Sequence, residues 1–410
     1  MSLNIFVSAG EPSGDLLAGE MLEHLKELLP EAKFFGICGE RMRRSGCEEL
    51  FSIEELSVMG FVEVLKHLSY IKRLESSLLE EIEIRKPQIS ILIDYPGFHL
   101  RLGDALKLRG SFVFQYVAPQ LWAWASWRTK KLKASTDEVL GIMPFEAEFF
   151  RQREVNYTYV GTPQVDRALA ASGDRARFGL DTSKKIVGFF PGSRRSEIQK
   201  LLPRMLAARE SLRRLDPNLH FVLSAAPNLS LTLFAEQLGV VLPAPSIESE
   251  GLKVFELGDT TLVQGQSIHL MKCSNAALVT SGTATLECAL VGTPMAVGYV
   301  MQGLSYQIAK RFVKLPHISL VNLVADYGLV KEFVQNFTGD ELAAELLKLI
   351  RDDGYREGKK QELNALDQKL KGNLAQKAAE AIASCYRDGL PGSRHLQSLK
   401  PAALEKTTSK

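Results

Sequence analysis

The sequence predicts an α/β protein with two doubly wound domains. Its apolar strands are continuous runs, such as Ile89–Asp94 ("ISILID") and Ile186–Phe190 ("IVGFF"), and each ends at a Gly- or Pro-containing loop. Continuous runs indicate strands buried on both faces, hence parallel sheets with helices on each side. The pattern restarts after Gly161–Pro163 in a chain long enough for two cores. We therefore expect a first domain at 1–165 and a second at 166–350.

The elements follow in a regular order. In the first domain "LNIFVS" precedes the loop "AGEPSGD" and a helix over Leu16–Leu29, and "ISILID", "SFVFQYV", "DEVLGIM" and "YTYVG" are the later strands. The second domain has "KIVGFF", "HFVLSAA", "TLVQG", "AALVTSG" and "PMAVGYV". Leucines at helical spacing then predict one helix from Leu363 to about Arg387. We expect this segment, 351–388, to pack on the first domain, and the polar residues 389–410 to be disordered.

Composition excludes several classes of protein. The net charge is only +2, so we expect no nucleic-acid partner. The five cysteines have no metal-ligand spacing, and no Asp-x-Asp motif occurs, so no metal or cofactor is expected. No uninterrupted apolar run of about 18 residues exists to span a membrane. Because the N-terminal residues also lack the features of a signal peptide, we expect a cytoplasmic protein.

Two loops of the second domain suit a diphosphate. Ser281-Gly282-Thr283 follows a strand and opens a helix, where free N–H groups and the helix dipole favour an anion. Glu287, one turn further, can accept hydrogen bonds from a ribose. The alternative is an ordinary helix cap with a solvated glutamate.

The second of these loops is "PGSRRSEI", which contains Ser193 and Arg194. A guanidinium can hold two phosphate oxygens through its planar fork. The alternative is a surface loop with solvated arginines. Ligands of open α/β sheets bind at the carboxyl ends of the strands, where both loops lie, and this favours the functional interpretation.

The first domain offers carboxylates for proton transfer. Asp94 ends a buried strand, and Glu11 lies in the first strand–helix loop. Either could act as general base on a sugar hydroxyl if its surroundings raised its pKa. A capping role for Asp94 and a solvated Glu11 are the alternatives.

Eight short motifs together give a specific resemblance. "SAGEPSGD", "MGFVEVL", "IDYPGF", "APQLWAW", "MPFE", "PGSRRSEI", "SGTATLE" and "SLVNLV" resemble, in order and spacing, those of the lipid-A-disaccharide synthase family. The resemblance covers roughly residues 3–385. It implies the two-domain GT-B fold, and an inverting, metal-independent transfer of 2,3-diacylglucosamine from its UDP derivative to 2,3-diacylglucosamine 1-phosphate.

The resemblance also implies roles for individual residues. It assigns UDP to a set in the second domain: Ser193, Arg194, Gly265, Gln266, Ser281, Gly282, Thr283, Glu287 and Asn322. It places Glu11 and Asp94 beside the reacting sugars. Some relatives have a second aspartate where this chain has Gly97, so His99 or Asp94 is expected to take over that proton transfer.

Both substrates implied by the resemblance are lipids, so we expect peripheral contact with the cytoplasmic face of the inner membrane. The segment Leu56–Leu74 mixes apolar and basic side chains as an interfacial helix does. The expected membrane contacts are Val58, Met59, Phe61, Val62, Leu65, Lys66, Leu68, Lys72 and Arg73. The alternative is an amphipathic core helix.

All three tryptophans, Trp122, Trp124 and Trp127, lie within six residues and are followed by Arg128, Lys130 and Lys131. Tryptophan suits an acyl-chain or sugar wall with one wet edge, and the cations suit a phosphate. We expect this segment to contact the lipid acceptor, with domain-interface packing as the alternative.

Two other functions are kept as alternatives. One is a UDP-N-acetylglucosamine 2-epimerase-like enzyme, and the other is a non-catalytic UDP-sugar or lipid-binding protein on the same fold. The C-terminal helix is expected either to fold back onto the first domain or to be exchanged with a second copy in a homodimer.

Overall fold

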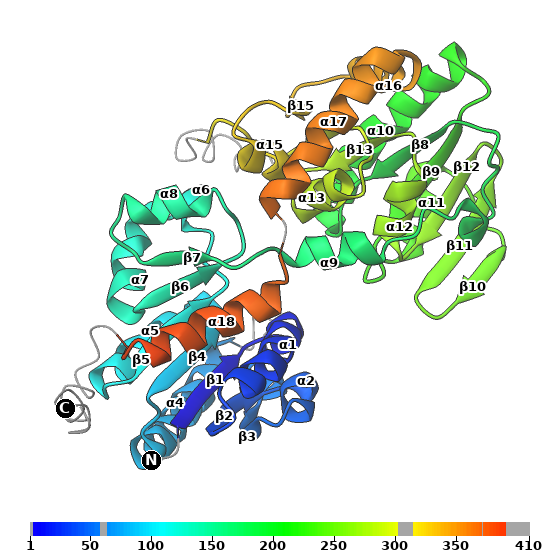
Figure 1. Ribbon diagram of the computed structural model, residues 1–410. Helices are drawn as coiled ribbons and strands as arrows, with labels where there is room; N and C mark the ends of the chain where they lie inside the picture. The colour runs from blue at the N-terminus through cyan, green and yellow to red at the C-terminus, as the bar shows by residue number, and fades with distance from the viewer. Residues whose placement is uncertain (1–2, 58–63, 302–314, 371, 391–410) are drawn as a thin grey trace. The chain divides into compact units, whose positions relative to one another are not determined.

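The computed structural model describes residues 3–57, 64–301, 315–370 and 372–390 (Figure 1). The chain forms two compact units, Met1–Thr162 with Gly372–Lys410, and Pro163–Lys371. Each unit contains one sheet with helices packed on it, which confirms the predicted α/β class.

The sheet of the first unit has the order β3-β2-β1-β4-β5-β6-β7. All its neighbouring strands are parallel. Its elements are β1 (Leu3–Ala9), α1 (Pro12–Leu28), β2 (Ala32–Cys38), α2 (Glu40–Arg44), β3 (Glu48–Ser52), α3 (Ile53–Ser57), α4 (Val64–Arg85), β4 (Ile89–Ile93), α5 (Pro96–Leu108), β5 (Phe112–Tyr116), α6 (Leu121–Trp124), η1 (Ser126–Arg128), α7 (Thr129–Ser135), β6 (Glu138–Gly141), α8 (Glu146–Arg151), β7 (Tyr157–Tyr159) and, near the C-terminus, α18 (Leu374–Arg387).

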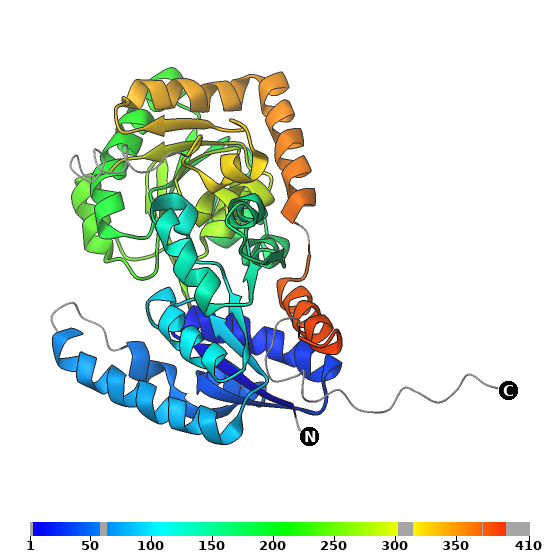
Figure 2. The ribbon, with the colours of Figure 1, turned by 90° about the vertical axis from the view of Figure 1, so that its left-hand side faces the viewer.

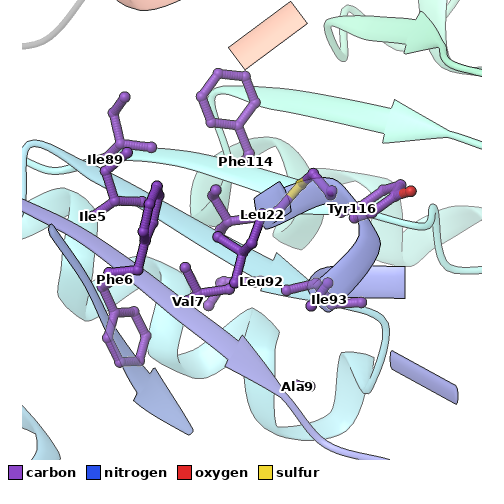
Figure 3. Packing of buried hydrophobic residues seen from close by; sticks show 14 of the residues in the cluster. Ile5, Phe6, Val7, Ala9, Leu22, Ile89, Leu92, Ile93, Phe114 and Tyr116 are labelled. Atoms are coloured by element: carbon purple, nitrogen blue, oxygen red, sulfur yellow. The ribbon is translucent and has the colours of Figure 1, made fainter. Parts of the chain in front are cut away.

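The core of the first unit explains its continuous apolar strands. Side chains of β1, β4 and β5, including Ile5, Leu92 and Phe114, pack with Leu22 of α1 (Figure 3). All four are at most 1% exposed, because α1 covers one face of the sheet and α5 the other. Figure 2 shows α18 lying along α1 within this unit.

The sheet of the second unit has the order β10-β11-β12-β9-β8-β13-β14-β15. Its elements are α9 (Pro163–Ala170), η2 (Arg175–Phe178), β8 (Ile186–Phe190), α10 (Arg195–Leu215), β9 (His220–Ala225), α11 (Leu231–Leu238), β10 (Ile247–Ser249), β11 (Leu252–Leu257), β12 (Thr260–Gln264), α12 (Ser267–Cys273), β13 (Ala276–Thr280), α13 (Thr283–Leu290), β14 (Met295–Tyr299), α15 (Leu320–Ala325), β15 (Lys331–Val334), α16 (Gly339–Arg351) and α17 (Asp353–Leu370).

One edge of the second sheet differs from the parallel pattern expected from the sequence. The strands β10, β11 and β12 are antiparallel neighbours. Gly251 and Gly258 stand at the two turns with φ of +72°, a conformation that favours glycine and permits a tight reversal. The remaining strands are parallel as expected.

The prediction of a single C-terminal helix over 363–387 is wrong, because the structure has two helices there. The helix α17 belongs to the second unit and α18 to the first. Gly372 has φ of +144°, and the Asn373 side chain accepts a hydrogen bond from the Gln376 backbone, which starts a new helix. The leucine spacing continues across the break because Leu370 and Leu374 are each buried, but in different units.

Candidate functional site

In the first unit, Glu11 and Asp94 lie at the point where the strand order reverses. Glu11 follows β1 and Asp94 follows β4, and these two strands are parallel neighbours. Gly10 has no room for a side chain, because a Cβ atom would collide with the Tyr95 ring. The two loops are therefore in direct contact at the switch point, where open α/β sheets bind ligands.

The backbone at Asp94 is strained and tightly held. Asp94 and Tyr95 have φ of +51° and +47°, an unusual pair of consecutive left-handed residues without glycine. The Asp94 N–H donates to the Tyr116 carbonyl at 2.8 Å, and its own carbonyl accepts from Gln115 Nε2 at 3.2 Å. These bonds hold the backbone from which the partly exposed carboxyl group projects.

The surroundings of Asp94 suit a general base. Partial burial raises the pKa of its carboxyl group, and a hydrogen bond from the Tyr95 backbone offsets part of that shift. A raised pKa makes the carboxylate a better proton acceptor. Glu11 is also exposed, and its side chain makes no capping hydrogen bond to α1.

His99 is fully buried beneath this loop. Its Nδ1 lies 2.7 Å from the Asp94 carbonyl, and its Nε2 lies 2.9 Å from the Ser8 hydroxyl. A carbonyl can only accept, so Nδ1 carries the proton and Nε2 accepts from Ser8. Burial lowers the pKa of His99 to about 4. Both ring nitrogens are thus engaged within the fold.

The tryptophan segment follows β5, the neighbour of β4. Trp122 donates its indole N–H to Glu146 at 2.7 Å, whereas Trp127 is 66% exposed. Lys131 pairs with Asp104, Lys130 is exposed, and Arg128 is partly exposed. Trp124 is the last residue of α6. We expected one role for all three tryptophans, but Trp122 and Trp127 have different surroundings.

The expected membrane contacts fall largely outside the described part of the chain. Val58, Met59, Phe61 and Val62 lie outside it entirely, as do the side chains of Leu65, Lys66, Leu68 and Lys72 in α4. Arg73 is exposed, while Leu74, Leu78 and Ile82 of the same helix are buried against the sheet. Among the described residues, no helix is both long and apolar enough to cross a bilayer.

In the second unit, the two predicted anion loops are neighbours. They follow β8 and β13, which pair in parallel at the switch point of that sheet. In the first loop, the Glu197 carboxylate accepts from the backbone N–H groups of Ser193 and Arg194 at 3.2 and 3.3 Å. It also accepts from Arg194 Nη1 at 2.9 Å, while most of the Arg194 side chain faces solvent. A carboxylate of this chain thus occupies the donors expected to hold an anion.

The second loop is anchored from below. Ser281 donates its hydroxyl to the Ile318 carbonyl at 2.7 Å, and Gly282, with φ of +142°, is the N-cap residue before Thr283. Glu287 lies one turn into α13, mostly buried, with Arg167 at 3.3 Å. Burial raises the pKa of Glu287 and Arg167 partly counters it.

The other residues predicted to bind UDP have backbone conformations or hydrogen bonds that hold loops of the second unit. Gly265 has φ of +88°, and a side chain there would strike the Gly251 carbonyl. Gln266, also left-handed, accepts a hydrogen bond from Arg177. Asn322 is buried, with its amide bonded to both backbone groups of Val330 and to Glu332.

Sequence reasoning missed several residues that shape these sites. They are Gln115, Glu146, Arg167, Glu197 and Glu332. Glu197 and Glu332 accept backbone N–H groups at the starts of α10 and α15. Glu197 had a usable signal, three residues into the helix after Arg194, and Glu146 ends the "MPFE" motif. The others meet their partners through tertiary contacts. Among the described residues, no cluster of three or more His, Cys, Asp or Glu could hold a metal ion.

Comparison with known proteins identifies the family of this chain. The chain matches the lipid-A-disaccharide synthetase family model over residues 5–385. It is 40% identical to the lipid-A-disaccharide synthase of Trichlorobacter lovleyi over 381 residues, 91% of this chain and 94% of the relative. The synthase of Geobacter sulfurreducens is 36% identical over 373 residues, 90% of this chain and 93% of that one.

Solved structures agree on the fold. The crystal structure of UDP-GlcNAc 2-epimerase from Neisseria meningitidis, bound to UDP-GlcNAc, has a TM-score of 0.54 and covers 94% of this chain and 99% of that one. At 13% identity this likeness shows the fold alone. The epimerase alternative is not favoured, because the synthase family model matches residues 5–385 and the synthases above are 36–40% identical to this chain.

The two Rossmann-like units show the GT-B fold, and the family match places the chain among the glycosyltransferases of that fold. Within that class, the chain belongs to the lipid-A-disaccharide synthase family. Its function is the synthesis of the lipid A disaccharide.

Proposed function

We propose that this enzyme transfers 2,3-diacylglucosamine from its UDP derivative to the 6-hydroxyl of 2,3-diacylglucosamine 1-phosphate, giving the β-1,6-linked disaccharide 1-phosphate and UDP. The observation that carries the donor half is that the two loops follow the neighbouring strands β8 and β13. A diphosphate would displace the Glu197 carboxylate from the donors of the first loop. Arg194 and the N–H groups before α10 and α13 would neutralise charge that grows on the diphosphate. Glu287 would accept hydrogen bonds from the ribose.

The acceptor half rests on the first unit. In the proposed step the Asp94 carboxylate takes the proton of the 6-hydroxyl as the oxygen attacks the anomeric carbon. The bond from that carbon to the UDP oxygen breaks, and its electron pair leaves with UDP. Attack opposite the leaving group inverts the anomeric centre. Glu11 lies at the same switch point as a second carboxylate, and His99 holds the Asp94 loop.

Both substrates carry acyl chains, so we propose peripheral binding at the cytoplasmic face of the inner membrane. The exposed Arg73, Trp127 and Lys130 support contact with lipid headgroups or with the acceptor phosphate. For α18, which packs on α1, we propose a segment folded back onto its own chain rather than one exchanged with a second copy.

UDP release from the full-length protein tests the proposal. Both lipids are supplied in detergent with EDTA, to the wild type and to Asp94→Asn and Arg194→Ala. We expect release that needs both lipids, persists in EDTA, and falls at least a hundredfold in Asp94→Asn with UDP binding intact. Arg194→Ala should weaken UDP binding itself.

Other outcomes separate the alternatives. Full activity of Asp94→Asn would move the base to Glu11. UDP binding without release under any condition would leave a non-catalytic binding protein.

A further inference from the structure

Three elements of the first unit converge on one buried carboxyl group. Glu146 is the first residue of α8 and is only 1% exposed. Trp122 of α6 donates to its Oε1 at 2.7 Å, and the Tyr157 hydroxyl of β7 lies 2.9 Å from its Oε2. Within the described residues, no lysine or arginine pairs with it. A buried carboxylate without a cation is costly, so its protonation state needs an explanation.

The two contacts of the Tyr157 hydroxyl indicate the protonation state of Glu146. The Tyr157 oxygen lies 2.6 Å from the Met143 carbonyl as well as 2.9 Å from Glu146. A hydroxyl has a single proton, and a carbonyl can only accept, so the shorter contact takes the tyrosine proton. The longer contact is then a hydrogen bond only if Glu146 carries a proton and donates it to Tyr157.

Neighbouring residues hold Tyr157 and Trp122 in position for these hydrogen bonds. A side chain at Gly141 would occupy the space of the Tyr157 ring, so glycine there admits the ring. The Phe150 ring stacks on the Tyr157 ring, with centroids 5.3 Å apart. The Phe145 and Trp122 rings meet edge-to-face, with centroids 4.9 Å apart. Both aromatic partners are thus fixed in place, and Glu146 joins them.

We propose that Glu146 is held as a neutral carboxylic acid and is a positioning residue that fixes the Trp122 indole at the acceptor side of the first unit. The inference rests on the proposed function in one respect: Trp122 is taken to contact the acceptor. Burial acts in the same direction and raises the pKa of Glu146 to about 7, although the hydrogen bonds that Glu146 accepts from Trp122 and from the Met143 backbone partly counter it.

Glutamine is the decisive substitution, because its amide reproduces the neutral acid. Its N–H can donate to Tyr157 and its carbonyl can accept from Trp122, so Glu146→Gln should fold and work as the wild type does. Glu146→Ala removes both contacts. The loss of one such hydrogen bond, about 1 kcal/mol, corresponds to roughly a fivefold rise in KM for the acceptor.

The test combines spectroscopy with kinetics on the full-length enzyme. At pH 5.5, infrared difference spectra of wild type minus Glu146→Gln should show a protonated carboxyl stretch. Acceptor KM should rise about fivefold in Glu146→Ala and stay within twofold in Glu146→Gln, with UDP affinity unchanged in both. A purely structural role would not give this split between acceptor KM and UDP binding.

The results that would overturn the proposal are equally specific. A missing carboxyl stretch, or a Glu146→Gln variant as defective as Glu146→Ala, would mean that Glu146 is ionised. Unchanged acceptor KM in a folded Glu146→Ala would remove the positioning role. If the wild type releases no UDP at all, the proposed function fails, while the infrared spectrum still decides the protonation state.

Discussion

The imidazole of His99 donates from Nδ1 to the Asp94 carbonyl at 2.7 Å and holds the candidate base in a left-handed conformation. The Ser8 hydroxyl fixes the other side of the ring. Because burial lowers the pKa of the ring, we infer that His99 supports Asp94 and does not carry the proton itself.

A matched pair of substitutions separates these roles. In His99→Asn the amide keeps a donor for the Asp94 carbonyl, whereas His99→Leu fills similar volume without one. We expect kcat to fall about tenfold or more in His99→Leu and less in His99→Asn, as a lost hydrogen bond to a strained loop implies. UDP release measures this, with UDP binding as the control. Equal and near-total loss in two folded variants would instead favour proton transfer by the ring.

Glu197 occupies the donors of Ser193 and Arg194 that a diphosphate would need. We therefore predict that Glu197→Gln binds UDP about three- to tenfold more tightly, because a competing negative charge is removed. The same change should cost about 0.5–1 kcal/mol of stability through the weakened start of α10. Titration calorimetry with UDP checks the first part. Weaker binding would show that Glu197 supports the loop and does not compete for it.

Glu287 is predicted to recognise the ribose of UDP. Glu287→Ala should lose the preference for UDP over 2′-deoxy-UDP, and the wild type should prefer UDP by about five- to tenfold, the value of one hydrogen bond to a charged group. Competition binding with the two nucleotides measures the ratio. Arg167→Met is the partner control, because the pKa of Glu287 should rise further without that guanidinium. An unchanged ratio in Glu287→Ala would place ribose recognition elsewhere.

The buried Glu146 predicts an unusual dependence of stability on pH. Its pKa is raised from 4.5 to about 7 in the folded protein, so the fold binds more protons than the unfolded chain between those values. Its contribution is complete below pH 4.5 and is lost as the pH rises to about 7. Relative to wild type, Glu146→Gln should therefore gain roughly 1.4 kcal/mol per pH unit across that window.

Tryptophan fluorescence is a suitable measure of this effect, because all three tryptophans belong to the first unit. Urea unfolding followed at pH 5, 6 and 7 gives the difference between the two proteins. His99 acts with the opposite sign, since its lowered pKa makes the fold lose stability as the pH falls from 6.5 towards 4. A constant difference between wild type and Glu146→Gln would mean that Glu146 does not titrate in this range.

The class of fold, most of the strands and the family could be predicted from the amino-acid sequence. Continuous apolar runs such as Ile89–Ile93 and Ile186–Phe190 form strands that are buried on both faces of a sheet. Such a run can be recognised from neighbouring residues of the sequence alone. The positions of Asp94 and Ser281 at strand ends followed from the same pattern. The break before α18 escaped prediction, because the leucine spacing continued through it while the chain passed from one unit to the other.

The partners and the protonation states of the site side chains depend on long-range contacts in the folded chain. Strand order made neighbours of Glu11 and Asp94, and long-range contacts joined Trp122 to Glu146 and His99 to Ser8. Burial then set the protonation states, so the histidine that the sequence offered as a base is neutral and enclosed. Protonation depends on solvent exclusion and on partners far away in the chain, and neither is encoded in a local run of residues.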